Sequence, residues 1–259
     1  MLSYRKLAMR VLGRPLHTGG GIDSPRPASQ RAAALILTAA LLTGAAFPAF
    51  ADTYYIEDGD ITISAGTQAG TNKVEQTGKE TVENDRDTII TNRKEDTASS
   101  HTVTINAGND KVEVTLDNVN IKADSGSALT SNGDVTLTLK GENHLTGGNG
   151  DIYGGDGITS SGSLTISGGT VTATGGNNTG SDGSGGSGIY SVSGSVTISG
   201  GSTVTANGGS GTISGGSGIY SVSGDVTISG GTVTANGGSG KDGYGGYGIS
   251  SSDVAISGG

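Results

Sequence analysis

The sequence contains no cysteine and no tryptophan, and aromatic side chains make up only 4% of its 259 residues. The absence of cysteine excludes a disulfide framework and any cysteine-ligated metal site. It does not exclude export, because many secreted proteins have no disulfide. Basic residues are scarce beyond residue 51, where 9 Lys and Arg against 23 Asp and Glu leave a net charge of −14. Such an acidic surface disfavours nucleic acid and anionic membranes as partners, and it is compatible with neutral polysaccharides or with anionic polymers bridged by divalent cations.

Glycine, in contrast, is abundant, with 50 residues. Without the strict three-residue period of collagen, this content usually indicates disorder. The exception is a repeat fold, in which glycine marks turns at a fixed interval. Periodicity therefore decides the fold class, and composition alone would mislead.

The first 51 residues have the order of segments that is typical of a secretory signal peptide. An apolar run covers residues 32–46, and Ala49, Phe50 and Ala51 form an A-x-A cleavage site. The run is about 15 residues long, and a membrane-spanning helix needs about 20. We therefore expect residues 1–51 to be removed on export, leaving a chain that is secreted or at the cell surface and not inserted in a membrane. An uncleaved N-terminal membrane anchor is the alternative. Basic residues precede the run: Arg5, Lys6, Arg10, Arg14, Arg26 and Arg31.

From about residue 101 the sequence alternates apolar and polar residues, and from residue 128 it repeats. An apolar residue after Ala or Gly recurs at intervals of 29, 31, 30 and 30 residues, at Leu129, Ile158, Ile189, Ile219 and Ile249. A second alternating segment follows in each unit, from Val135, Leu164, Val196, Val226 and Val254. A third follows in three units, from Thr170, Thr203 and Thr232. Alternation with period two predicts three short β-strands in each unit.

One side of each expected strand is apolar, and the other carries mostly threonine. Glycine pairs at 168–169, 200–201 and 230–231 separate the second strand from the third, where a positive φ is cheap only for glycine. One unit cannot bury its apolar side alone, but units stacked about 4.8 Å apart pair their backbones and share an aliphatic core. The inward residues expected are Leu164, Ile166, Val171, Ala173, Val196, Ile198, Val204, Ala206, Val226, Ile228, Val233, Ala235, Val254 and Ile256.

These features predict an all-β fold, a single-stranded right-handed parallel β-helix (solenoid) with about 30 residues per coil. The right-handed sense follows the general rule for parallel crossovers. Residues 52–100 hold most of the charge and are expected to form an irregular N-terminal coil or cap, with strands near 61–63 and 88–90. Residues 101–259 form the repeats, and we expect a truncated C-terminus because the last unit stops before its third strand. The period-two pattern excludes a helical solenoid, and the unit is short for a β-propeller blade.

Two segments, VTLTLKGENHLTGG (135–148) and GGDGITSSGSLTISGGTVTATGG (154–176), resemble the secreted bacterial "carbohydrate-binding domain-containing" β-helix family, which is similar in fold to pectate lyases. The resemblance covers roughly residues 100–259. It implies binding of a polysaccharide or cell-wall glycan at the cell surface or outside the cell, in which calcium can assist. The repeat motif is fairly specific for the architecture and poorly specific for function, because similar repeats recur in adhesins.

Five tyrosines are the candidate carbohydrate-binding residues. Tyr190 and Tyr220 follow Ile189 and Ile219, so strand alternation points them outward in adjacent coils. Stacked tyrosines would give a flat amphipathic surface suited to sugar rings, and exposed aromatic side chains mark recognition surfaces. The alternative is an aromatic ladder that only supports the stack. Tyr153, Tyr244 and Tyr247 lie in or beside the glycine-rich loops and could extend such a surface.

Four aspartates are candidate calcium ligands. Asp151 and Asp156 lie in GGNGDIYGGDG (147–157), which approximates the calcium-binding nonapeptide without its spacing or its period. Asp225 and Asp253 precede equivalent strands one coil apart, and Asp134 precedes the equivalent strand three coils before Asp225. Carboxylates about 4.8 Å apart repel each other unless they are hydrated or bridged by a cation such as calcium. The alternative is that aspartate and serine are simply good turn residues.

Catalytic chemistry is poorly supported by the residues of the repeats. A lyase of similar fold would need a basic group beside a uronate carboxyl, but the last arginine is Arg93, and His144 has no serine or cysteine beside it in the sequence. The acids are scattered, whereas a glycoside hydrolase pairs two carboxylates across a sugar. The sequence therefore predicts a non-catalytic extracellular polysaccharide-binding β-helix. The rival hypothesis is an adhesive or structural cell-surface stalk without a sugar site, and a polysaccharide lyase is the third.

Overall fold

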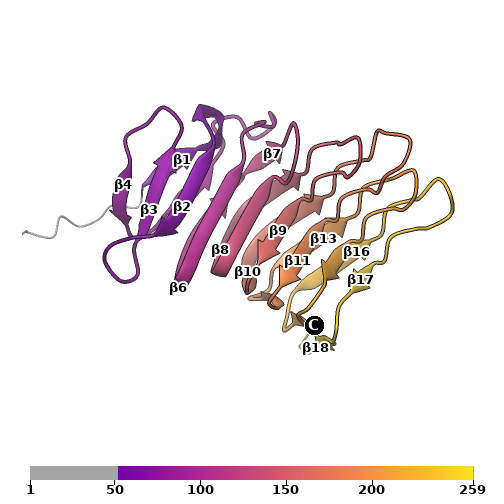
Figure 1. Cartoon of the computed structure of the whole chain (residues 1–259). Coiled ribbons are helices and arrows are strands. Elements are labelled where there is room, and N and C mark those ends of the chain that lie inside the picture. Colours follow the sequence, from indigo (N-terminus) through magenta and orange to yellow (C-terminus); the bar gives the residue numbers. More distant parts are fainter. Residues whose placement is uncertain (1–51, 259) are drawn as a thin grey trace, which may run out of the picture. The chain divides into compact units, whose positions relative to one another are not determined.

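The computed structural model describes residues 52–258, so the expected signal peptide lies outside the described residues. Within them the chain is all-β and forms a β-solenoid of about 6 turns, with about 29 residues per coil. The coils stack in sequence order, from β1 and β2 to β17 and β18 in Figure 1. The predicted fold class is confirmed. In the described part of the chain, no helix has the length and apolar character needed to cross a membrane.

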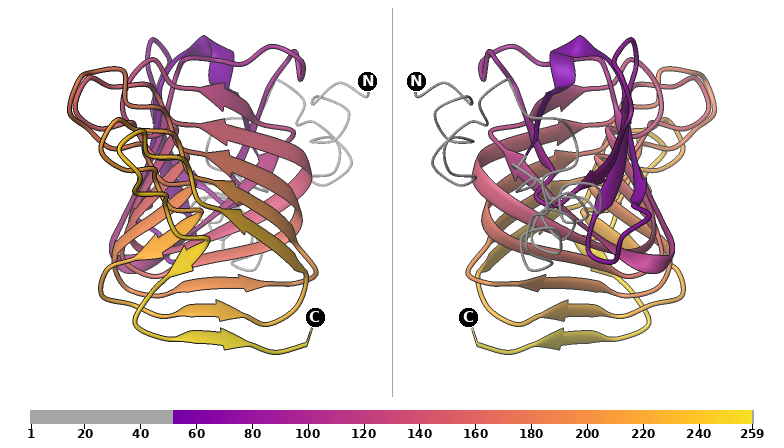
Figure 2. Two further views of the ribbon diagram at one scale, coloured as in Figure 1. Left: turned by 90° about the vertical axis from the view of Figure 1, so that its right-hand side faces the viewer. Right: turned by 90° about the vertical axis from the view of Figure 1, so that its left-hand side faces the viewer.

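Three ladders of parallel strands run along the stack, and we call them the first, second and third faces. The first face comprises β2 (Ile61–Ala65), the start of β6 (Val103–Asp117), the start of β8 (Leu129–Thr146), β9 (Ile158–Ser161), β11 (Ile189–Ser193), β14 (Ile219–Ser221) and β17 (Ile249–Ser250). Figure 2 shows the successive strands lying over one another in two opposite views.

Each coil continues from the first face onto the second, and most coils then continue onto the third. The second face comprises β1 (Thr53–Tyr55), β5 (Ile89–Thr91), the end of β6, the middle of β8, the start of β10 (Leu164–Thr174), β12 (Val196–Ser199), β15 (Val226–Ile228) and β18 (Val254–Ile256). The third comprises β7 (Asn120–Lys122), the ends of β8 and β10, β13 (Thr203–Asn207) and β16 (Thr232–Asn236).

The interior of the stack is aliphatic, as the alternation predicts. Equivalent positions pair directly, so Ile198 lies between Ile166 and Ile228, and all three are buried. The glycine pairs that separate the second and third faces all have positive φ, for example 65° at Gly200 and 72° at Gly201. In the last two described coils the inward side chains are less covered. Val254 and Ile256 in the last coil are exposed, and Val233 and Ala235 in the coil before it are half-buried.

The N-terminal coil combines ladder strands with one antiparallel hairpin. β2 pairs in parallel with β6, and β1 and β5 extend the second face, so the ladders begin before residue 100. β3 (Asn72–Gln76) pairs antiparallel with β2, and β4 (Val82–Asp85) pairs antiparallel with β3. A short 3₁₀ helix, Ile56–Asp58, follows β1. Val74 of the hairpin and Ile56 of this helix are both fully buried in the aliphatic core.

Glycine-rich loops connect the third face of one coil to the first face of the next, and they lie over one another at residues 147–157, 175–188, 208–218 and 237–248. Each loop has two arms, an outgoing and a returning segment, and backbone hydrogen bonds join these arms within a loop and between successive loops. Gly176 N–H donates to Gly155 O, Gly186 N–H to Gly176 O, and Gly209 N–H to Gly186 O. We call the set the glycine column: Gly148, Gly155, Gly176, Gly186, Gly209, Gly216, Gly238 and Gly246.

Candidate functional site

An outward row of hydroxyl-bearing side chains runs along the whole first face. Each member follows an inward aliphatic residue, so strand alternation turns it away from the core. The backbone pairings place one member in each coil. We call this the hydroxyl row: Thr62, Thr104, Thr130, Thr159, Tyr190, Tyr220 and Ser250.

The two tyrosines of the row contact each other, as the sequence predicts. Their ring centroids are 5.6 Å apart, and the ring planes are inclined by 30°. At this separation the rings pack in a tilted, offset arrangement, so part of each face covers the other. Ser250, which follows Tyr220 in the row, is too short to cover the other face of that ring. Tyr220 keeps 37% of its surface exposed, while Tyr190 is half-buried.

A second row lies three residues upstream of the hydroxyl row and contains Asp156. The carboxylate of Asp156 accepts hydrogen bonds from Thr159 Oγ1 (2.7 Å) and from the Ser187 backbone N–H (2.6 Å). Ser127 Oγ in turn lies 2.7 Å from Thr159 Oγ1. The two rows are therefore joined by hydrogen bonds beside Tyr190. Serine occupies the position of Asp156 in three coils and tyrosine in the last described one: Ser127, Ser187, Ser217 and Tyr247.

Burial shifts the titration of two groups at this site. It raises the pKa of the Asp156 carboxyl, and the hydrogen bonds from Thr159 and Ser187 oppose that shift. Burial also raises the pKa of the Tyr190 hydroxyl, with smaller contributions from Tyr220 and from Asp156. Tyr190 is therefore a neutral hydroxyl at ordinary pH, able both to donate and to accept a hydrogen bond.

The three loop tyrosines lie at two different places relative to the Tyr190–Tyr220 pair. Tyr153 pairs with Ser184, Ser184 with Ser214, and Ser214 with Tyr244, so Tyr153 and Tyr244 lie three coils apart in the glycine-rich loops. Tyr247 precedes Ser250 by three residues, beside the hydroxyl row. All three loop tyrosines are strongly exposed.

The four candidate calcium ligands lie in different environments. Asp151 Oδ1 accepts a hydrogen bond from Thr179 Oγ1 (3.1 Å), and Asp156 is held as described above. Asp225 and Asp253 are exposed and one coil apart, preceding the paired residues Val226 and Val254. Among residues 52–258 no group of three or more His, Asp or Glu side chains is placed to hold a metal ion. A calcium ion at either position would therefore need backbone carbonyls or water as further ligands.

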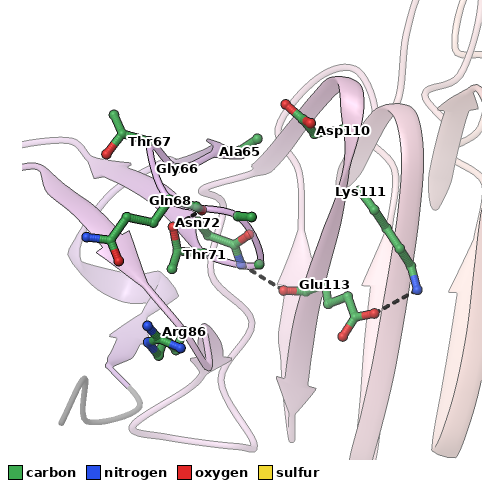
Figure 3. A pocket seen from close by; sticks show the side chains of 12 residues that line it. Ala65, Gly66, Thr67, Gln68, Thr71, Asn72, Arg86, Asp110, Lys111 and Glu113 are labelled. Carbon is green, nitrogen blue, oxygen red and sulfur yellow. Dashed lines mark hydrogen bonds and ion pairs between the residues drawn. The ribbon is translucent and has the colours of Figure 1, made fainter. Parts of the chain in front are cut away.

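A separate cleft of about 480 Å³ lies at the N-terminal coil, between the β2–β3 loop and the β6 strand (Figure 3). Eight of its twelve lining residues have polar side chains. Two cationic groups, Arg86 and Lys111, face it together with two acids, Asp110 and Glu113. The remaining lining residues are Ala65, Gly66, Thr67, Gln68, Ala69, Gly70, Thr71 and Asn72.

Protein-family models, curated proteins and solved structures contain no match to this chain. The geometry of the two sites must therefore carry the functional argument. Sequence reasoning missed the N-terminal cleft, because its walls come from three segments, 65–72, Arg86 and 110–113, that lie apart in the sequence and show no motif. It placed Asp156 in a calcium motif and overlooked its contact with the hydroxyl row, although its position three residues before Thr159 could have shown this.

Proposed function

We propose that this chain is a secreted, non-catalytic carbohydrate-binding β-helix that holds a polysaccharide along the hydroxyl row. The observation that carries the proposal is the contact between Tyr190 and Tyr220 in the middle of that row. The exposed face of Tyr220 offers an apolar surface to the C–H groups of a sugar ring. The threonine and serine hydroxyls along the row supply hydrogen-bond donors and acceptors for its hydroxyl groups.

The period of the row supports an extended polymer as the ligand. Backbone-paired coils are about 4.8 Å apart, so the row repeats at nearly the length of one sugar unit in an extended polysaccharide. A chain lying along the row could make a similar contact at each coil. Repetition of weak contacts raises avidity without any single strong contact.

Two sequence features support the extracellular setting. They are the signal-peptide pattern of residues 1–51 and the resemblance of residues 135–176 to secreted carbohydrate-binding β-helices. An acidic surface favours neutral glycans, and calcium could bridge an acidic glycan to the Asp225–Asp253 pair. Calcium is therefore an accessory in this proposal and is not needed by the hydroxyl row.

The decisive experiment measures binding of the purified chain to a panel of neutral and pectic polysaccharides, with calcium and then with chelator. The double variant Tyr190→Ala, Tyr220→Ala should weaken binding about ten-fold or more, equivalent to about 1.4 kcal/mol. Tyr190→Phe with Tyr220→Phe keeps the rings and removes their hydroxyls, so it should retain most of the affinity if ring contact dominates.

A matched control is Thr197→Ala, which removes an outward hydroxyl on the second face and should leave binding unchanged. Saturable binding that is indifferent to the tyrosine substitutions would refute the hydroxyl row as the site. Loss of binding in chelator would assign a bridging role to calcium.

The rival function, a structural or adhesive stalk, is favoured by one observation. The glycine column joins the loops of successive coils by backbone hydrogen bonds, which stiffens a projecting rod. A stalk would bind none of the polysaccharides, although the chain would show clear β-type circular dichroism.

A further inference from the structure

The cleft at the N-terminal coil has one wall that is held in place by internal hydrogen bonds. The β2–β3 loop, residues 66–71, closes on itself where Gly66 N–H donates to Thr71 O (2.8 Å). Asn84 Oδ1 then accepts hydrogen bonds from Thr67 Oγ1, the Gln68 backbone N–H and Thr71 Oγ1, each 3.0 Å long. A loop tied at three points to one side chain is preorganised, which lowers the entropic cost of binding a ligand against it.

The opposite wall is also fixed, and its charges are partly neutralised. Lys111 Nζ lies 2.7 Å from Glu113 Oε1, and Asn72 Nδ2 donates to Glu113 O (2.8 Å), as the dashed lines in Figure 3 show. The ion pair raises the pKa of Lys111, so this ammonium group stays charged. The wall therefore presents a paired cation and the carboxylate of Asp110.

Arg86 is the cationic group of the cleft that is not engaged by a neighbouring acid. It lies in the turn between β4 and β5, its side chain is exposed, and the structure of residues 52–258 records no ion pair for it. The adjacent Asp85 is buried and accepts a hydrogen bond from Thr88 Oγ1 (2.7 Å). In a chain with so large an excess of acids, a guanidinium left to face a cleft marks a place for an anionic group.

The other side chains that line the cleft indicate the chemical class of its ligand. Alanine is the largest apolar side chain, so an aromatic or aliphatic ligand would gain little by entering. Thr67, Gln68 and Thr71 offer hydroxyl and amide groups that suit a polyol. Asp110 and Glu113 would repel a doubly charged phosphate, whereas a singly charged carboxylate matches the planar fork of one guanidinium.

We propose that this cleft binds an acidic sugar residue, with Arg86 holding the carboxylate and the β2–β3 loop contacting the sugar hydroxyls. Its residues come from the first coils, and Tyr190 and Tyr220 lie several coils away, so this site does not depend on the hydroxyl row. It adds a position selective for uronic acids that is separate from the hydroxyl row.

The test is a titration of the isotope-labelled full chain with sodium galacturonate at constant ionic strength. Binding is measured by NMR through the chemical shifts of the backbone amides. Saturable shifts should appear in residues 66–72, and galactose should produce none of comparable size. Arg86→Gln should weaken galacturonate binding about ten-fold or more, and Arg86→Lys should also weaken it because the bidentate fork is lost. Asp110→Asn removes a like charge and should tighten binding.

The matched control is Lys241→Gln, which removes an exposed cation in the last described loop and should leave the affinity unchanged. Equal shifts with galactose, or unchanged affinity in Arg86→Gln, would overturn the proposal. Galactose 6-sulfate that binds as tightly as galacturonate would overturn the carboxylate assignment. The amide spectrum of each variant reports its folding in the same experiment.

Discussion

Asp156 shows how one side chain can depart from the repeat. Its row otherwise contains serine or tyrosine, and its half-buried carboxylate accepts hydrogen bonds from Thr159 and from the Ser187 backbone N–H. A half-buried carboxyl whose pKa is raised binds its proton more tightly in the folded chain than in the unfolded chain. The folded state is then favoured at low pH, and this advantage is lost as the pH rises through the folded-state pKa.

Asp156→Asn should therefore stabilise the chain at pH 7 and have little effect near pH 4, around the usual pKa of an aspartate. Asparagine can still accept the Ser187 N–H, and Thr159 can reverse its hydroxyl to accept from the amide. Urea denaturation at the two pH values measures the difference. Asp225→Asn, at an exposed aspartate, is the control, and an equal pH response in both variants would contradict the role of burial.

The residue scale also shows what alternation can and cannot predict. The outward direction of Tyr190 and Tyr220, and their contact, follow from period two and a 30-residue interval, and both are confirmed. The tilt of the rings and the burial of Asp156 depend on side-chain packing between coils. Such packing leaves no trace in a single repeat.

At the scale of elements, the glycine-rich loops differ most from what composition suggests. Stretches of glycine and serine are typical of flexible linkers. Here each loop has two arms close enough for backbone hydrogen bonds, and a Cβ added at Gly186 would lie 2.1 Å from Gly155 O. Glycine is needed at position 186 because the two arms approach each other closely there, and not because the backbone requires a positive φ. The approach of two arms that are separated in sequence could not be predicted from either arm.

Gly186→Ala should therefore destabilise the chain by about 1–3 kcal/mol, the range for overpacking a close-packed interior. Gly245→Ala is a matched control in the same set of loops, because the nearest atom to its added Cβ is Gly238 O at 3.7 Å. That control should be neutral or slightly stabilising, since alanine restricts the unfolded chain. Thermal or urea denaturation compares the two, and equal effects would show that the column is not close-packed in solution.

At the scale of the whole molecule, the repeated parts of the solenoid can be predicted from the sequence and the unrepeated parts cannot. The three faces, the corner glycines and the aliphatic interior all follow from the repeat, because each unit must bury the same side chains against its neighbours. The β3–β4 hairpin is different, since it occurs once and pairs antiparallel. The N-terminal cleft belongs to this unrepeated part, so no periodic pattern could have predicted it.

Stacking also predicts that the cost of a cavity depends on its place along the solenoid. Ile198 is fully buried between Ile166 and Ile228, whereas Ile256 occupies the equivalent position in the last described coil and is 68% exposed. Ile198→Ala should destabilise the chain by about 2–5 kcal/mol, because it removes contacts with the coils on both sides. Ile256→Ala should cost less than about 1 kcal/mol, since most of its side chain already contacts water.

Urea denaturation of both variants measures this difference, with an unchanged m value as evidence that the denatured state is the same. Because each coil contacts only its neighbours, the loss at Ile198 should also speed hydrogen exchange in β10, β12 and β15 more than in β2. If Ile256→Ala cost as much stability as Ile198→Ala, the Ile256 side chain would have to be covered in solution. Contacts restricted to neighbouring coils instead predict the larger loss of stability for Ile198→Ala.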